Sequence, residues 1–205
     1  MSVSELSTST QNYLKAIWGL KEWSSEPVTA TLIAKQLGLK LSSVSDAVRK
    51  MAKQGLVSHT PYGSVELTEL GRQYALVMVR RHRLLESFLV QALGYTWDEV
   101  HNEAENLEHA VSDMLIERVD KFLDYPTRDP HGDPIPTVDG QITIPSAHRL
   151  TDSGAQSQVT VERISDSDPQ LLKFLEERGI VTGAVLSTRE GAPFSDSLEI
   201  QVAGS

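Results

Sequence analysis

The 205-residue sequence predicts a mainly α-helical protein with small β elements, and three observations carry that prediction. Apolar residues recur at helical spacing over most of residues 10–123. Segments containing Gly, Pro or Ser interrupt this spacing where helices and hairpins would turn. Residues 158–205 instead alternate short apolar runs with turn residues, which is typical of strands. We therefore expect helices first and a small, mostly β domain at the end.

The first elements follow the order of a winged helix-turn-helix. Thr29 can cap the second helix, and Gly55 follows the third. The expected helices cover residues 10–23, 30–37 and 42–54, and the expected hairpin strands cover 56–60 and 65–67. In this arrangement the second helix of the motif enters the major groove of DNA. The same pattern used for protein contacts is the alternative interpretation.

The outward side chains of the third helix and of the hairpin tip suit a DNA surface. Short hydroxyl side chains bond to phosphates or base edges, and basic side chains attract the backbone. The expected DNA-binding residues are Thr29, Lys40, Ser42, Ser43, Ser45, Asp46, Arg49, Lys50, Tyr62 and Ser64.

The charge distribution supports this placement although the whole chain carries -9. Residues 1–75 hold eight Lys and Arg against six Asp and Glu, whereas residues 76–205 hold eleven against 22. Nucleic acid would bind the first part, and the acidic remainder would attract cations. No apolar run approaches the roughly 18 residues of a membrane helix, and the N-terminus lacks a signal-peptide pattern, so we expect a cytoplasmic protein.

The middle of the chain predicts long helices followed by a loop. Thr68 can cap a helix over 69–93, and Thr96 can cap another over 97–106 that continues or bends into 107–123. We expect a DNA-binding domain over 1–75, a helical domain over 76–146, a linker over 147–157 and a final domain over 158–205.

Histidines and carboxylates gather on two of these helices. At 100° per residue, the face of the later helix would carry His101, Glu105, Glu108 and His109 within about 100° of arc. The earlier helix offers His82 and Glu86 at i and i+4. Each pair alone is typical of a solvated face, but three of the six histidines stand in this set, which predicts a divalent cation site.

The donor types favour particular metals. The chain has no cysteine, so any ligands are nitrogen and oxygen. Imidazole and carboxylate suit manganese(II) and iron(II) better than copper, while zinc(II) stays open as an alternative.

The sequence resembles the diphtheria toxin repressor family of iron- and manganese-dependent regulators. Three segments carry the resemblance: Arg81–Glu86, His101–Asp113 and the loop Pro130–Pro136. It implies a winged-helix DNA module, a helical dimerisation and metal module, and a C-terminal SH3-like domain with further strand sequence expected after Val202. The loop was interpreted as a structural turn.

The resemblance also implies two metal sites per subunit. One site matches His82, Glu86 and His101, and the other matches Glu105, Glu108 and His109. Iron-responsive members carry cysteine at the Glu105 position and manganese-responsive members carry glutamate, so the resemblance favours manganese. It further suggests Asn12 as an N-terminal ligand, and Glu162 as a ligand from the final domain, with Ser165 or Asp166 as alternatives.

These observations predict a metal-dependent repressor of metal-uptake genes that binds a palindromic operator as a homodimer, and not an enzyme. The expected dimer stripe is Leu107, Val111, Met114, Leu115, Val119 and Phe122. An iron-dependent repressor of the same family is one alternative. A carboxylate–histidine dimetal enzyme and a regulator that senses an organic ligand are two others.

Overall fold

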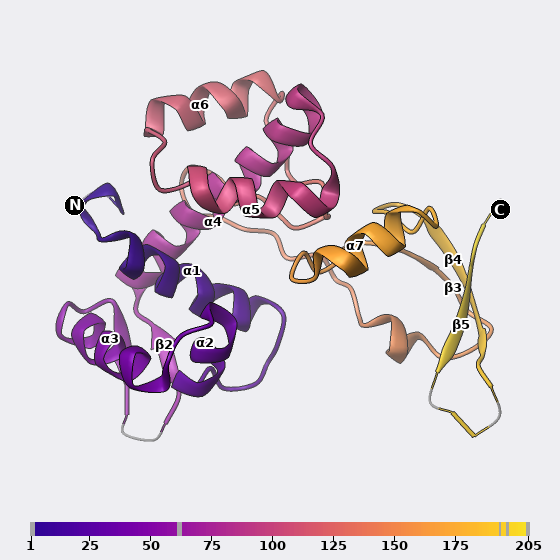
Figure 1. Ribbon diagram of the computed structural model, residues 1–205, viewed down its shortest axis with the longest axis horizontal. Helices are drawn as coiled ribbons and strands as arrows, with labels where there is room; N and C mark the ends of the chain where they lie inside the picture. The colour runs from indigo at the N-terminus through magenta and orange to yellow at the C-terminus, as the bar shows by residue number, and fades with distance from the viewer. Residues whose placement is uncertain (1–2, 61–62, 193, 196, 204–205) are drawn as a thin grey trace. The chain divides into compact units, whose positions relative to one another are not determined.

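The computed structural model describes residues 3–60, 63–192, 194–195 and 197–203 (Figure 1). The chain forms two compact units. The first comprises residues 1–82, 108–110 and 136–141, and the second comprises 83–107, 111–135 and 142–205. The expected domain boundaries at 75, 146 and 157 stay a prediction.

The first unit contains the winged helix-turn-helix. A short 3-10 helix (Val3–Glu5) precedes α1 (Thr8–Glu22), α2 (Ala30–Leu37), α3 (Leu41–Lys53), β1 (Val57–His59) and β2 (Val65–Leu67). The two strands pair antiparallel, with Ser58 opposite Glu66. Thr29 caps α2 as predicted, because its side chain accepts a hydrogen bond from the amide of Leu32.

One apolar core holds these helices together. It includes Leu14 and Ile17 from α1, Ile33 from α2, and Val44 and Val48 from α3, all of which are buried. Burial of each such side chain contributes about 1.5–3 kcal/mol. Because α1 and α3 share this core, a constraint on α1 reaches α3.

The junction between the hairpin and α4 (Glu69–Leu93) depends on a close backbone approach. A Cβ atom at Gly71 would stand 1.9 Å from the carbonyl oxygen of Leu56, so only glycine fits there. Thr68 caps α4 as predicted, since its hydroxyl accepts from the amide of Gly71 at 3.1 Å and donates to the carbonyl of Gly55 at 2.7 Å.

In the second unit, α5 (Trp97–Leu107) and α6 (Asp113–Phe122) are separate helices. The predicted single helical face over 101–109 is therefore wrong: only His101 and Glu105 share α5, and Glu108 and His109 stand on the turn that follows. Ser112 accounts for the break, because its hydroxyl accepts the amide of Leu115 at 3.2 Å and starts a new helix.

The apolar stripe of α6 divides between the core and the surface. Val119 is buried with Ile116 in the core of the second unit, so its assignment to a dimer stripe is corrected. Leu107 and Val111 pack partly against the same core. Met114, Leu115 and Phe122 are 65%, 45% and 66% exposed and remain available to a partner.

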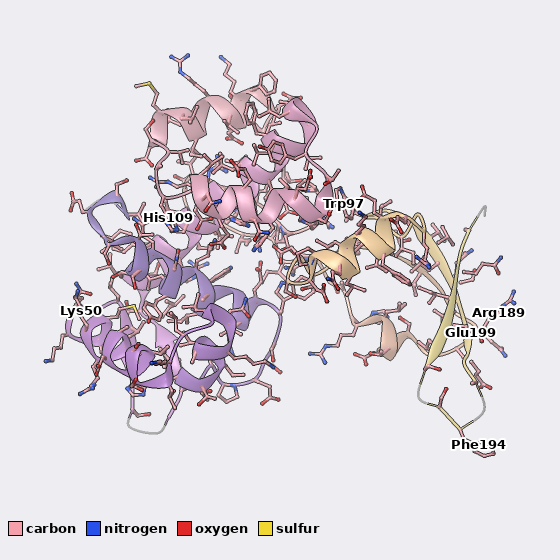
Figure 2. The ribbon with its side chains drawn as sticks, viewed as in Figure 1. Lys50, Trp97, His109, Arg189, Phe194 and Glu199 are labelled. Atoms are coloured by element: carbon pink, nitrogen blue, oxygen red, sulfur yellow. The ribbon has the colours of Figure 1, made fainter. Side chains whose placement is uncertain are left out.

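The C-terminal SH3-like domain contains one antiparallel sheet in the order β3-β4-β5. Its strands are β3 (Gln158–Thr160), β4 (Val185–Glu190) and β5 (Leu198–Val202), and α7 (Pro169–Glu176) contacts α5. Figure 2 shows Arg189 and Glu199 on neighbouring strands, where they are register partners. The predicted linker contains a 3-10 helix (Leu150–Ser153). None of the helices in the described residues has the length and apolar character of a membrane span.

Candidate metal centres

Three side chains from three elements form what we call the first cluster: Glu86 on α4, His101 on α5 and Asp166 between β3 and α7. The Nδ1 atom of His101 lies 3.3 Å from Glu86 Oε1 and 3.1 Å from Asp166 Oδ2. Glu86 is completely buried. These donor atoms lie within 4.8 Å of one another, as the ligands of one ion must.

The first cluster has an excess of negative charge that calls for a cation. Burial lowers the pKa of His101, but hydrogen bonds to Asp166 and Glu86 outweigh burial and raise that pKa to about 10. At neutral pH the imidazole therefore holds a proton between two carboxylates. A divalent ion supplies two positive charges and would take the place of that proton.

Asp166, rather than Glu162, is the carboxylate that the final domain brings to His101. The carboxylate of Glu162 accepts a hydrogen bond from Arg128 at 2.6 Å, and the hydroxyl of Ser165 pairs with that of Ser167. Of the residues suggested from the sequence, Asp166 is therefore a better candidate ligand than Glu162, the first choice.

Contacts of Glu162 and of the two residues after it fix the backbone that leads to Asp166. The Nε atom of Arg163 donates to Asp133 Oδ1 at 2.5 Å, and the amide of Ile164 donates to the carbonyl of His131 at 2.9 Å. A Cβ atom at Gly132, whose φ is +88°, would stand 2.1 Å from the carbonyl oxygen of Glu162. The loop Pro130–Pro136 is therefore the surface on which this segment rests.

Substituting the two candidate carboxylates separately tests which one binds metal. Asp166→Ala should weaken manganese binding about tenfold or more, because one charged ligand is lost. Glu162→Ala, a change of the same kind four residues earlier, should leave that affinity unchanged. Titration of each variant with Mn²⁺ against a fluorescent chelator measures both. Equal losses in the two variants would contradict the assignment of Asp166.

Two buried residues beside Glu86 escaped the sequence interpretation. Donor atoms of Asp129 and His131 lie within 4.8 Å of Glu86, and both ring nitrogens of His131 are buried with no hydrogen-bond partner among the described residues. Burial, Glu86 and Asp133 together raise the pKa of Asp129 well above its usual range. The spacing Asp129-x-His131 could have indicated these two donors in the sequence. It lies in a Pro- and Gly-rich segment for which the sequence predicted only a structural turn.

A second cluster, His82, Glu108 and His109, lies in the first unit, where Gln11 and Lys15 of α1 contact it. His82 Nδ1 is 2.6 Å from Glu108 Oε2, and His109 Nε2 is 3.5 Å from Glu108 Oε1. His109 Nδ1 is 2.6 Å from Gln11 Oε1. Figure 2 labels His109 where the chain leaves α5.

The division of these ligands between two sites, which the resemblance implies, stays a prediction. Within the first unit, His82 Nδ1 lies 2.6 Å from Glu108 Oε2. On α5, Glu105 Oε1 lies 3.8 Å from His101 Nε2.

The second cluster also fits a cation. The side-chain oxygen of Asn12 is buried and accepts no hydrogen bond from the described residues. Such an oxygen costs about 1–3 kcal/mol unless a donor or an ion satisfies it. Burial raises the pKa of Glu108, but the hydrogen bond with His82 and the charge of Lys15 outweigh burial, so the pKa lies below its usual value. Glu108 is therefore ionised at neutral pH. Oxygen and imidazole donors of this kind suit a hard or borderline divalent ion.

The expected DNA-binding side chains divide into free and engaged groups. Ser42, Ser43 and Lys50 are exposed on α3, and Lys50 projects outward in Figure 2. Arg49 forms an ion pair with Asp46. Three expected hydroxyls already make local hydrogen bonds: Thr29 to Leu32, Ser45 to Leu41 and Ser64 to Glu66. Lys40 precedes α3 and is exposed, and Tyr62 lies outside the described residues.

Comparisons with known proteins agree with this arrangement. Residues 5–65 match the N-terminal DNA-binding domain of iron-dependent repressors, residues 68–137 match their metal-binding and dimerisation domain, and residues 148–205 match the FeoA domain. The iron-dependent repressor IdeR of Mycobacterium tuberculosis is 35% identical over 194 residues, which cover 89% of this chain and 84% of that protein.

Several solved structures are similar over nearly the whole chain, and two of them show the range. One is a manganese-dependent transcriptional repressor in complex with manganese, with a TM-score of 0.91, 48% identity, and coverage of 96% of this chain and 90% of that chain. The other is ScaR with bound Zn²⁺, with a TM-score of 0.82, 32% identity, and coverage of 95% and 90%.

Proposed function

The chain belongs to the iron-dependent repressor family, and we propose that it responds to manganese(II). As a member of this family it is a metal-dependent, DNA-binding transcriptional repressor and not an enzyme. The main support for this proposal is the set of donor atoms. Both clusters consist of imidazole and carboxylate groups, and the chain has no cysteine thiolate. Glu105 also stands where iron-responsive members carry cysteine, and the repressor in the similar structure with 48% identity binds manganese. Iron(II) remains the alternative, because IdeR is described as iron-dependent.

We infer two ions per subunit. Glu86, His101 and Asp166 would hold the first, with Glu105, Asp129 and His131 as further donors nearby. His82, Glu108 and His109 would hold the second, and Asn12 would add its amide oxygen. Each ion would be shared by several ligands and would therefore hold together segments that are far apart in the sequence.

The second cluster explains how metal would control DNA binding. It joins α1, through Gln11 and Lys15, to the turn that carries Glu108 and His109. Because α1 and α3 share one core, fixing α1 restricts the positions open to the DNA-facing helix. Metal that binds this restricted form more tightly shifts the population toward it, and DNA in turn tightens metal binding.

The family domains indicate a homodimer on DNA. We propose that its operator is palindromic, because a two-fold dimer presents two equal DNA-binding helices. The exposed residues Met114, Leu115 and Phe122 supply the dimer contact. We further propose that the protein acts in the cytoplasm, on genes for metal uptake.

The test is DNA binding with each metal in turn. Promoter DNA from the protein's own genomic neighbourhood is titrated in metal-free buffer, then with Mn²⁺, anaerobic Fe²⁺ or Zn²⁺, at one salt concentration because phosphate contacts are salt-dependent. We expect Mn²⁺ to tighten binding strongly. Equal binding with and without every metal would contradict the proposed switch, and a gain with Fe²⁺ alone would select the alternative metal.

A lysine substitution tests the DNA face. Lys50→Ala should weaken binding to all DNA sequences alike and reduce the slope of log affinity against log salt by about one, because one phosphate contact is lost. Lys173→Ala, an exposed lysine on α7, is the matched control and should change neither quantity. Fluorescence anisotropy at several salt concentrations measures both, and identical slopes for wild type and Lys50→Ala would exclude the contact.

A further inference from the structure

The second cluster already contains a cation that belongs to the protein. The ammonium nitrogen of Lys15, on α1, lies 2.7 Å from each carboxylate oxygen of Glu108 and 3.4 Å from His82 Nδ1. The Lys15 side chain is 15% exposed and that of Glu108 is fully buried. Both oxygens that a metal would use on Glu108 are therefore engaged by one ammonium group.

We propose that Lys15 is a tethered competitor of the metal, which sets the affinity of the second cluster for divalent cations. The proposal rests on the function proposed above, in which this cluster binds metal. It assigns Lys15 a role in setting the metal concentration at which the protein responds.

Charge explains why the ammonium opposes the metal. The single negative charge of Glu108 is already balanced by Lys15, so an incoming divalent ion adds two positive charges beside a third. Repulsion between charges a few ångströms apart is strong where little water screens it. The metal therefore binds only as the Lys15–Glu108 bond is given up, and the metal affinity is reduced by the strength of that bond.

The lysine side chain suits this exchange. Its ammonium sits on four flexible methylene groups, and part of the side chain already reaches solvent. It can swing outward without movement of α1, whereas the buried Glu108 cannot. In the absence of metal, the same bond ties α1 to Glu108 and spares the protein an unpaired buried carboxylate.

The experiment measures metal affinity in variants of the full chain. Lys15→Gln removes the charge and keeps a hydrogen-bond donor for Glu108, so the fold is retained, and thermal unfolding checks this. Competition with a fluorescent chelator, using MnCl₂ alone, should show binding about tenfold or more tighter than wild type. Lys15→Arg keeps the charge and should resemble wild type. Lys21→Gln, an exposed lysine on the same helix, should also match wild type.

A second set of variants assigns the gain to the second cluster. In a His109→Ala background, Lys15→Gln should not increase the affinity for Mn²⁺, because the second cluster has lost a ligand and no longer holds the ion with which Lys15 competes. Unchanged or weaker manganese binding in Lys15→Gln, or a gain equally large in Lys15→Arg, would overturn the proposal. If the wild type bound no Mn²⁺ while Lys15→Gln did, competition would be upheld and the proposed manganese response would fail; no binding in either would refute both.

Discussion

Glu108→Gln is expected to abolish most of the manganese-dependent gain in DNA affinity. Glu108 lies within ion-pair distance of His82, His109 and Lys15, and it is completely buried. An amide in its place has no charge and offers one oxygen. Loss of such a ligand should weaken manganese binding at the second cluster by on the order of 100-fold.

Two measurements separate this effect from general damage to the protein. In Mn²⁺ titrations of operator binding, Glu108→Gln should need a much higher manganese concentration than wild type for half-maximal binding. Its operator affinity without metal should stay near that of wild type. Glu103→Gln is the control, since Glu103 lies on α5 and belongs to neither cluster. A Glu108→Gln protein that still responds at the wild-type manganese concentration would remove the second cluster from the mechanism.

Local patterns in the sequence predicted most helices and their first residues. Thr29 and Thr68 cap α2 and α4 as expected, because a capping hydroxyl acts on amides two or three residues later. The types of residue that could hold metal were also visible, since His and Glu at helical spacing are a local signal. The winged helix-turn-helix followed from the order of the elements alone.

The contacts of individual ligands could not be predicted from such patterns. Glu108 and His109 lie on the turn after α5, and Ser112 caps α6 after that turn. Asp166 approaches His101 only because Arg163 and Ile164 rest on a loop some thirty residues earlier in the chain. Contacts between distant segments of this kind have no period in the sequence.

The composition argument was also incomplete for a physical reason. A net charge is a sum, and it hides a cation such as Lys15 inside a cluster of acids. The sequence predicted acidic sites that would attract a cation. In the structure, His101 lies between Glu86 and Asp166, which raise its pKa to about 10, and the Lys15 ammonium lies beside Glu108. We therefore propose that metal binding in this protein is an exchange of cations.

Met114→Asp is expected to convert the protein to a monomer and to weaken operator binding by about 100-fold or more. Met114 is 65% exposed on α6 beside Leu115 and Phe122, so the substitution leaves the core of the second unit intact. In a symmetric dimer the same change occurs on both partners and places two carboxylates in an apolar contact. A monomer binds one half-site and loses the effective concentration that links the two.

Sedimentation velocity with and without Mn²⁺ measures the assembly, and anisotropy measures DNA binding. Phe174→Asp on α7 is the matched control: Phe174 is 48% exposed, apolar, and part of the SH3-like domain instead of α6. It should leave the dimer intact. Because Met114 lies outside both clusters, the monomer should still bind Mn²⁺. Loss of dimerisation with retained metal binding would thus separate the two tasks of the central domain, and a Met114→Asp protein that stays dimeric would move the interface elsewhere.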